Sequence, residues 1–188
     1  MITLIIVGCQ NDYVTGTTSS RGTKNVIEEI KKFIKSHKKE IDKIIIAAEW
    51  HPYNHVSFKK YGGNQPHHCI QYTPGACIEP KLLKIIQSLE IDYEVSTRGE
   101  IEEVDQIGAF NEIEFVTDEL GQRYYFDSLA TADANTDFVV CGIAEKDSIK
   151  NTILNLITGE IFPKVFVPGI FPSINDFIEE HKIEKVNV

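Results

Sequence analysis

Short runs of β-branched and other apolar residues alternate along this chain with amphipathic helical patterns, and this alternation limits the fold more than any other feature of the sequence. The apolar runs lie at residues 2–7, 43–48, 92–96, 137–142, 164–169 and 184–188. Such an alternation is typical of a parallel β-sheet with helices on both faces. We therefore predict an α/β fold with three α-β-α layers, Rossmann-like, around six parallel strands.

Helical spacing of apolar residues connects most of these runs. The apolar positions recur three or four residues apart in four segments, which contain Ile27, Ile30 and Ile34, then Leu82, Ile85, Ile86 and Leu89, then Ile149, Ile153 and Leu156, and finally Ile174, Phe177 and Ile178. These four segments are predicted helices.

The connection between the apolar runs at residues 92–96 and 137–142 does not follow this alternation of strand and helix. Residues 113–116 (IEFV) and 123–126 (RYYF) flank the turn-type sequence TDELGQ, which predicts a β-hairpin in place of a full crossover helix. Any helix there is expected to shrink to residues 128–133 (SLATAD). The other long connection, residues 50–80, is rich in His, Gly, Asn and Pro, and loops of that length are usually functional.

Length and charge restrict the classes of partner. A chain of 188 residues can bury a core without disulfides or a structural metal, so we expect a single domain over residues 1–188. The net charge of -9 argues against nucleic acid and anionic membrane surfaces, which leaves a small molecule or a protein as partner. The short apolar opening predicts neither a signal peptide nor a membrane span, and four cysteines without C-x-x-C spacing predict reduced thiols in the cytoplasm.

In a doubly wound sheet, ligands bind beyond the carboxyl ends of the strands. A carboxylate and imidazoles gather at one such end, where Glu49, His51 and His55 follow the second apolar run and His67 and His68 lie further along the same loop. Glu49 and His51 are two residues apart, so an extended backbone points both side chains the same way. The set suits a divalent metal such as Zn, Fe or Mn. The alternative is that these are solvated loop histidines.

Two motifs that follow one another in the sequence resemble the motifs of a known family. EWHPYNHVSF (residues 49–58) followed by QPHHCIQYTPGA (residues 65–76) resembles the nicotinamidase and pyrazinamidase branch of the isochorismatase-like cysteine hydrolases. The segments LIIVGCQNDY, STRGEIEEVDQIGAF and CGIAEKDSIKNT are similar to further motifs of that family. The resemblance therefore spans nearly the whole chain.

The resemblance implies a catalytic Asp, Lys and Cys, and this chain differs at all three positions. Gly8 stands at the position of the Asp, Arg98 at that of the Lys, and Ser148 at that of the Cys. A serine hydroxyl is a weaker acid than a thiol and needs a positioned base, yet Gly8 has nothing with which to accept a proton. Loss of general base catalysis alone removes ~10²- to 10⁴-fold of rate. Arg98 stays charged and could anchor a carboxylate.

Other site residues follow from the same resemblance. The metal ligands correspond to Glu49, His51 and His68, with His55 beside them. Tyr13 keeps the aromatic position of the ligand pocket, whereas Gln65 replaces a Trp, so nicotinamide is only a default ligand. The amides of Ala144 and Ser148 correspond to the oxyanion hole, and the bond between Ile143 and Ala144 to a cis peptide.

These residues are compatible with three functions. The leading hypothesis is a pseudoenzyme or sensor that binds a small carboxylate or amide between Arg98, the amides of Ala144 and Ser148, and a possible metal. The enzymatic alternative is a weak amide hydrolase that uses Ser148, or a water activated at the metal site, as nucleophile. The third is a structural subunit, because relatives commonly assemble; we expect a homo-oligomer.

Overall fold

The computed structural model describes residues 1–110, 115–117, 123–125, 136–144 and 146–187. Its central element is a six-stranded sheet in the order β3-β2-β1-β6-β7-β8. All five pairings in this sheet are parallel. The sheet strands are β1 (Ile2–Gly8), β2 (Ile41–Glu49), β3 (Asp92–Arg98), β6 (Asp137–Ile143), β7 (Lys164–Phe171) and β8 (Lys185–Val186). The predicted α/β fold and the six predicted strands are confirmed.

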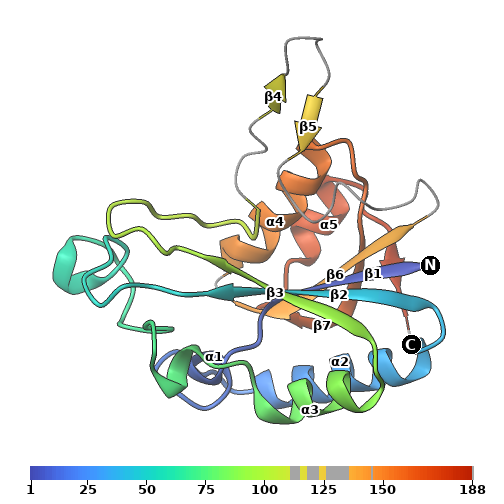
Figure 1. Cartoon of the computed structure of the whole chain (residues 1–188), viewed down its shortest axis with the longest axis horizontal. Coiled ribbons are helices and arrows are strands. Elements are labelled where there is room, and N and C mark those ends of the chain that lie inside the picture. Colours follow the sequence, from blue (N-terminus) through green and yellow to red (C-terminus); the bar gives the residue numbers. More distant parts are fainter. Residues whose placement is uncertain (111–114, 118–122, 126–135, 145, 188) are drawn as a thin grey trace.

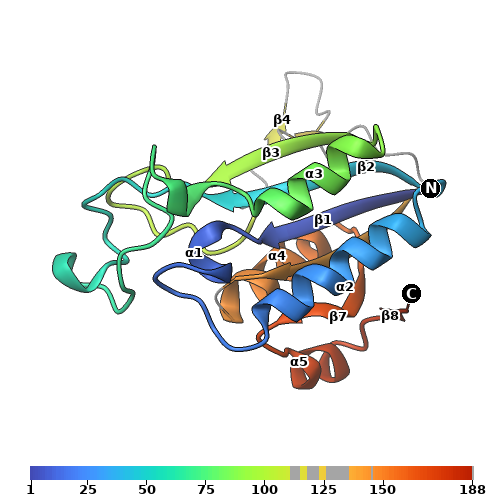
Figure 2. The same cartoon turned by 90° about the horizontal axis from the view of Figure 1, so that it is seen from below.

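Helices cover both faces of the sheet (Figures 1 and 2). α2 (Thr23–Ser36) and α3 (Pro80–Ser88) lie on one face, and α4 (Lys146–Thr158) and α5 (Asn175–Glu180) lie on the other. The four predicted helices are therefore present. Short additional helices are α1 (Asn11–Val14), η1 (Lys59–Tyr61) and η2 (Pro74–Ala76).

The core consists of two apolar layers, one on each side of the sheet. Successive strand side chains point to opposite faces, so Leu4 and Ile6 belong to the layer under α2 and α3, whereas Ile5 and Val7 belong to the layer under α4 and α5. All four side chains are fully buried. The near-continuous apolar runs of the sequence thus follow from a sheet that is covered twice.

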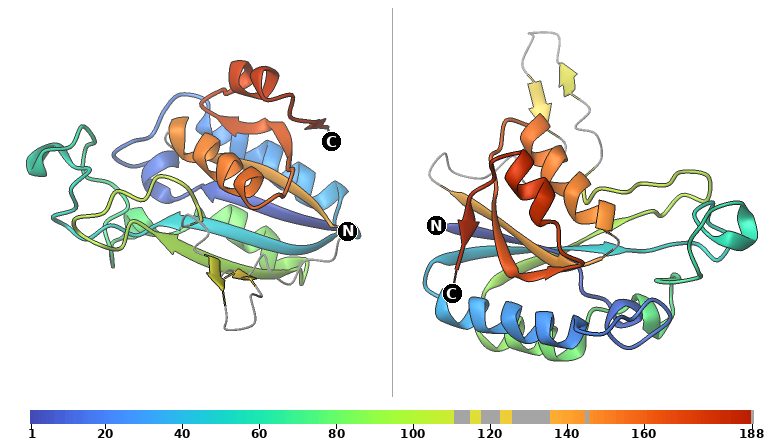
Figure 3. Two further views of the ribbon diagram at one scale, coloured as in Figure 1. Left: turned by 90° about the horizontal axis from the view of Figure 1, so that it is seen from above. Right: turned by 180° about the vertical axis from the view of Figure 1, so that it is seen from behind.

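The predicted hairpin is also present. β4 (Phe115–Thr117) and β5 (Arg123–Tyr125) pair in antiparallel fashion, and they stand on the same side of the sheet as α4 (Figures 1 and 3). The predicted short helix at residues 128–133 lies outside the described residues. No helix in the described parts of the chain is long and apolar enough to span a membrane.

The chain reverses its strand order between β1 and β6, where Gly8 at the end of β1 pairs with Ile143 at the end of β6. Gly8 has a φ of +69°, and the amide of Cys9 donates to the carbonyl of Ile143 at 3.0 Å. A Cβ atom at Gly8 would lie under 3.0 Å from that carbonyl oxygen, a separation that real Cβ atoms essentially never show. The backbone at this crevice is therefore built around a glycine.

We expect the substitution Gly8→Ala to lower the free energy of unfolding by about 3 kcal/mol or more, because it combines a disfavoured φ with a backbone collision. The matched control is Gly62→Ala, since Gly62 also has a positive φ (+102°) but nothing lies within 4 Å of a Cβ there. The control should cost about 1–2 kcal/mol. Urea unfolding followed by circular dichroism measures both, and equal losses would contradict the close approach at Gly8.

Candidate metal centre

Four strand ends meet at the edge of the sheet where a ligand is expected, and they carry Gly8, Glu49, Arg98 and Ile143. Glu49 is the last residue of β2, and Arg98 is the last residue of β3 and its direct partner in the parallel register. The loop after β2 returns to the same edge. The amide of His51 donates to the carbonyl of Cys69 at 3.0 Å, and this bond fixes His51 near the segment that contains His68.

Glu49, His51 and His68 form the one group of at least three potential ligand residues within the described parts of the chain, and all three are buried. Oε2 of Glu49 lies 2.8 Å from Nε2 of His68 and 3.3 Å from Nε2 of His51. Two ligand atoms bound to one tetrahedral zinc ion lie roughly 3.4 Å apart, given metal–ligand distances near 2.1 Å. The donor atoms are therefore already close to the spacing that a metal would need.

The other ring nitrogen of each imidazole, Nδ1, contacts a backbone carbonyl, and this contact keeps Nε2 turned toward Glu49. Nδ1 of His51 lies 3.0 Å from the carbonyl oxygen of Gly99, and Nδ1 of His68 lies 2.8 Å from that of Pro66. A carbonyl oxygen can only accept, so both Nδ1 atoms carry the proton and donate it. Nε2 of each ring, which faces Glu49, is then the nitrogen left for a metal, and a metal would bind it through the lone pair of a neutral ring, as is usual for metal-binding histidines.

Gly99 makes room for one of these rings. Any Cβ atom at Gly99 would collide with the imidazole of His51, and Gly99 has a φ of +66°. The glycine that follows Arg98 thus serves the metal centre directly.

Glu49 shares its two oxygens among several partners. Oε1 accepts from Nη2 of Arg98 at 2.7 Å, and Oε2 accepts from the hydroxyl of Tyr13 at 2.5 Å. Burial raises the pKa of the Glu49 carboxyl, but the charge of Arg98 and the hydrogen bonds from His51 and His68 outweigh it and hold that pKa well below its usual range. Glu49 is therefore a carboxylate, with Oε2 turned toward the two histidines.

Arg98 was predicted to anchor a ligand, and its guanidinium contacts protein groups in this structure. The side chain is only 1% exposed, and it donates to Glu49 and to the carbonyl of Ile107. Its Nε is buried and has no hydrogen-bond partner among the residues that the structure describes. The residue at the family's lysine position thus supports the metal centre.

Gln10 joins the ends of β1 and β2 and was missed by sequence reasoning. Its side chain accepts from the amide of Glu49 at 2.8 Å and donates to the carbonyls of Glu49 at 2.7 Å and Ala76 at 2.8 Å. Gln10 is fully buried. A polar residue directly after a buried strand was the available signal, because a buried amide must find partners for both its donor and its acceptor.

The positions to which the resemblance assigns hydrolysis hold few reactive groups. Gly8 has no side chain, and Ser148 is 3% exposed in the first turns of α4. The Ala144 amide, predicted for the oxyanion hole, donates to the carbonyl of Phe171 at 3.3 Å. The prediction of a cis bond between Ile143 and Ala144 is wrong, since the cis peptide of the described backbone is Phe171–Pro172.

Cys9, which follows Gly8 in the sequence, is a poor substitute for a cysteine nucleophile. Cys9 is fully buried, and burial raises the pKa of its thiol to about 12. All four cysteines are free, and Cys77 is the exposed one.

The other residues predicted to lie at the ligand or metal site have different positions in the structure. Tyr13 is 3% exposed and bonded to Glu49, so it orients the carboxylate. Gln65 lies half-buried in the loop, where its backbone pairs with Ser57 and Lys59. His55 is buried outside the three-residue group, with Nδ1 2.7 Å from the Ser57 hydroxyl and Nε2 3.0 Å from the Val104 carbonyl.

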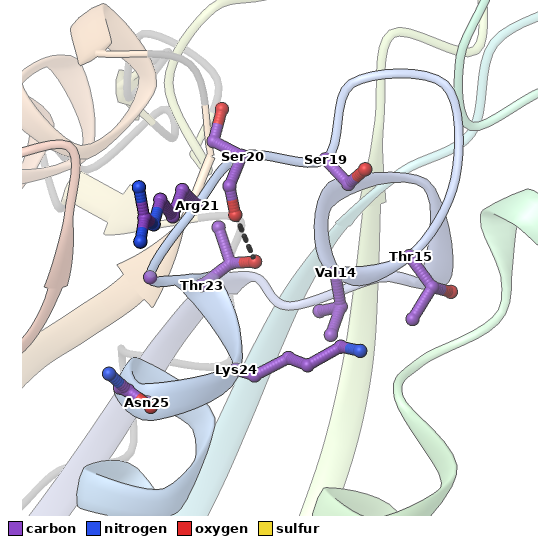
Figure 4. A pocket seen from close by; sticks show the side chains of 9 residues that line it. Val14, Thr15, Ser19, Ser20, Arg21, Thr23, Lys24 and Asn25 are labelled. Atoms are coloured by element: carbon purple, nitrogen blue, oxygen red, sulfur yellow. Dashed lines mark hydrogen bonds between the residues drawn. The ribbon is translucent and has the colours of Figure 1, made fainter.

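A separate cavity of about 530 Å³ lies between α1 and the start of α2 (Figure 4). Figure 4 shows Arg21, Lys24 and several hydroxyl side chains around it, with the Thr23 hydroxyl bonded to the carbonyl of Ser20 at 3.0 Å. None of the predicted site residues lines this cavity.

No protein-family model and no curated protein sequence matches the chain, but solved structures of several amidases have a similar fold. The yeast nicotinamidase is 19% identical with a TM-score of 0.78, and the alignment covers 100% of both chains. The pyrazinamidase of Pyrococcus horikoshii, solved in complex with zinc, is 19% identical with a TM-score of 0.74 over 100% of this chain and 99% of that one.

A more distant enzyme has the same architecture. The N-carbamoylsarcosine amidase of Thermoplasma acidophilum is 12% identical with a TM-score of 0.71, and the alignment covers 98% of this chain and 94% of that one. The resemblance inferred from the motifs is thus confirmed at the level of the fold: the chain has the fold of the isochorismatase-like hydrolases, the group that includes these nicotinamidases and pyrazinamidases.

Proposed function

We propose that this protein is a metal-dependent binding protein that uses the nicotinamidase fold and has lost hydrolysis by the cysteine route. The observation that carries the proposal is a contrast at one sheet edge. Glu49, His51 and His68 present three ligand atoms within 4.8 Å of one another, while the position of the general base is a glycine whose backbone leaves no room for a side chain.

The residues present fit a divalent metal of the zinc type. One carboxylate and two imidazoles with bonded Nδ1 atoms are a common zinc donor set, and three protein ligands leave at least one position for another molecule. Bound there, the metal would supply Lewis acidity toward an oxygen or nitrogen atom of a small carboxylate or amide. The Pyrococcus pyrazinamidase was solved in complex with zinc, and this independently supports the choice of zinc here.

The chain's own groups have defined tasks in this proposal. Arg98 and Tyr13 hold the Glu49 carboxylate by opposite oxygens, which leaves Oε2 directed at the histidines. All three ligand residues are buried, so charges at the centre are little screened by solvent. Ser148 has no base at position 8 to accept its proton, so its hydroxyl stays un-ionised at neutral pH.

The four free thiols agree with a reducing compartment, and we retain the cytoplasm as part of the proposal. A homo-oligomer likewise stays a prediction, which size-exclusion chromatography with light scattering would check.

We expect one zinc ion to bind per chain and to raise the free energy of unfolding by about 2.7 kcal/mol when free zinc exceeds its Kd 100-fold. His68→Ala should weaken zinc binding by roughly 100-fold or more, because it removes a ligand. The control is His67→Ala, since this neighbour is half-buried and outside the donor group. Isothermal titration calorimetry measures both, and equal affinities in the two variants would contradict the assignment.

We expect no enzymatic release of ammonia from nicotinamide or pyrazinamide, with wild type and Ser148→Ala giving the same background rate. Adding the family's nucleophile through Ser148→Cys should not restore turnover, because the base position stays empty and Gly8 cannot accept an Asp without moving Ile143. A coupled ammonia assay with zinc-loaded protein provides the test. Turnover that disappears in Ser148→Ala would establish the hydrolase instead, and turnover lost only in His68→Ala would establish a metal-dependent one.

A further inference from the structure

The four side chains of residues 10–13, at the start of α1, all bond to the part of the chain that carries the metal ligands. Each reaches residues 49–76, and the first and last of the four bond to Glu49. Asp12, the third, is the one whose carboxylate bonds beside a histidine of the metal centre. A Cβ atom at Gly75 would collide with this carboxylate, so the loop packs directly against Asp12.

Asp12 and Thr17 together hold both peptide groups that flank His68. Oδ2 of Asp12 accepts a hydrogen bond from the amide of Cys69 at 2.8 Å, and the hydroxyl of Thr17 donates to the carbonyl of His67 at 2.9 Å. Oδ1 of Asp12 accepts from the amide of Thr17 at 3.3 Å, which joins the two contacts. The backbone on each side of His68 is therefore tied to one short segment of the chain.

The backbone at Cys69 depends on such support. Cys69 is fully buried and has a φ of +47°, a left-handed conformation that a residue with a side chain adopts only where its surroundings hold it. Its amide is bonded to Asp12, and its carbonyl accepts from the amide of His51. A shift of Cys69 would therefore move the peptide group of His68, and with it the imidazole that faces Glu49.

We propose, on the basis of the function proposed above, that Asp12 and Thr17 are positioning residues of the metal centre. By holding the two peptide groups beside His68, they keep its Nε2 where a metal can bind it together with the carboxylate of Glu49. Ligands that are already in place spend less of the binding free energy on their own ordering, and groups that orient them strongly affect metal affinity. Neither residue belongs to the group of three ligand residues, so both act through His68.

The first experiment measures zinc affinity by competition with a chromophoric chelator, at a temperature where each zinc-free variant is folded. Asp12→Ala should weaken zinc binding by roughly 10-fold or more, because the Cys69 amide loses its acceptor. Asp12→Asn, which keeps one oxygen for that amide, should recover most of the loss. Asn11→Ala is the matched control, since Asn11 also ties α1 to the loop but donates to the Pro74 carbonyl, and its zinc affinity should stay within about 2-fold of that of the unaltered protein.

The second experiment asks whether Asp12 acts through His68. Once His68→Ala has removed the ligand, Asp12→Ala should weaken the remaining zinc binding by less than about 3-fold, because changes that act through one contact are not additive. A general loosening of the fold would weaken zinc binding equally in both backgrounds. Thr17→Val, which removes the hydroxyl and keeps the shape of the side chain, should weaken zinc binding by roughly 2- to 10-fold and show the same dependence on His68.

Different outcomes overturn the positioning role and the proposed function. Full zinc affinity in Asp12→Ala, an Asp12→Asn variant as weak as Asp12→Ala, an equal loss in Asn11→Ala, or a loss that is as large without His68 as with it overturns the positioning role and leaves the metal centre standing. Absence of zinc binding by the unaltered protein overturns both. If Asp12→Ala fails to fold, Thr17→Val decides in its place, and full zinc affinity in that variant overturns the positioning role.

Discussion

The ion pair between Glu49 and Arg98 is the interaction on which the rest of the site depends. Two residues that end neighbouring parallel strands meet at 2.7 Å in a buried environment, where an unpaired charge would be strongly destabilising. The pair holds one oxygen of the carboxylate, the Tyr13 hydroxyl binds the other, and His51 and His68 face that second oxygen. Two of the chain's departures from the family pattern, at positions 49 and 98, are therefore one physical unit.

At position 8, where the resemblance implies a general base, the backbone as well as the side chain differs from what a base would need. Gly8 adopts a positive φ and lies against the carbonyl of Ile143, so the backbone leaves no room for a side chain at this position. The Ala144 amide beside it donates to Phe171. Under the proposed function, the chemistry at this edge of the sheet lies at the end of β2, where Glu49, His51 and His68 could hold a metal.

Much of the fold could be predicted from the sequence, because the alternation of apolar runs and helical spacing reports directly which faces are buried. The grouping of Glu49, His51 and His68 followed from a strand end and its loop. The role of Arg98 did not, since its partner depends on which strand lies beside β2 and in what register. The hydrogen bond of Ala144 was equally hidden, because it requires the end of β7, whose pairing with β6 shifts between Val140 and Gly142.

The most direct test of the metal centre is a crystal structure of the protein grown with zinc, with anomalous diffraction recorded at the zinc absorption edge. We expect one strong peak within bonding distance of Oε2 of Glu49 and Nε2 of both His51 and His68, with Arg98 still bound to Oε1. Absence of a peak, or a zinc ion that displaces Arg98 and binds both oxygens of Glu49, would contradict this centre.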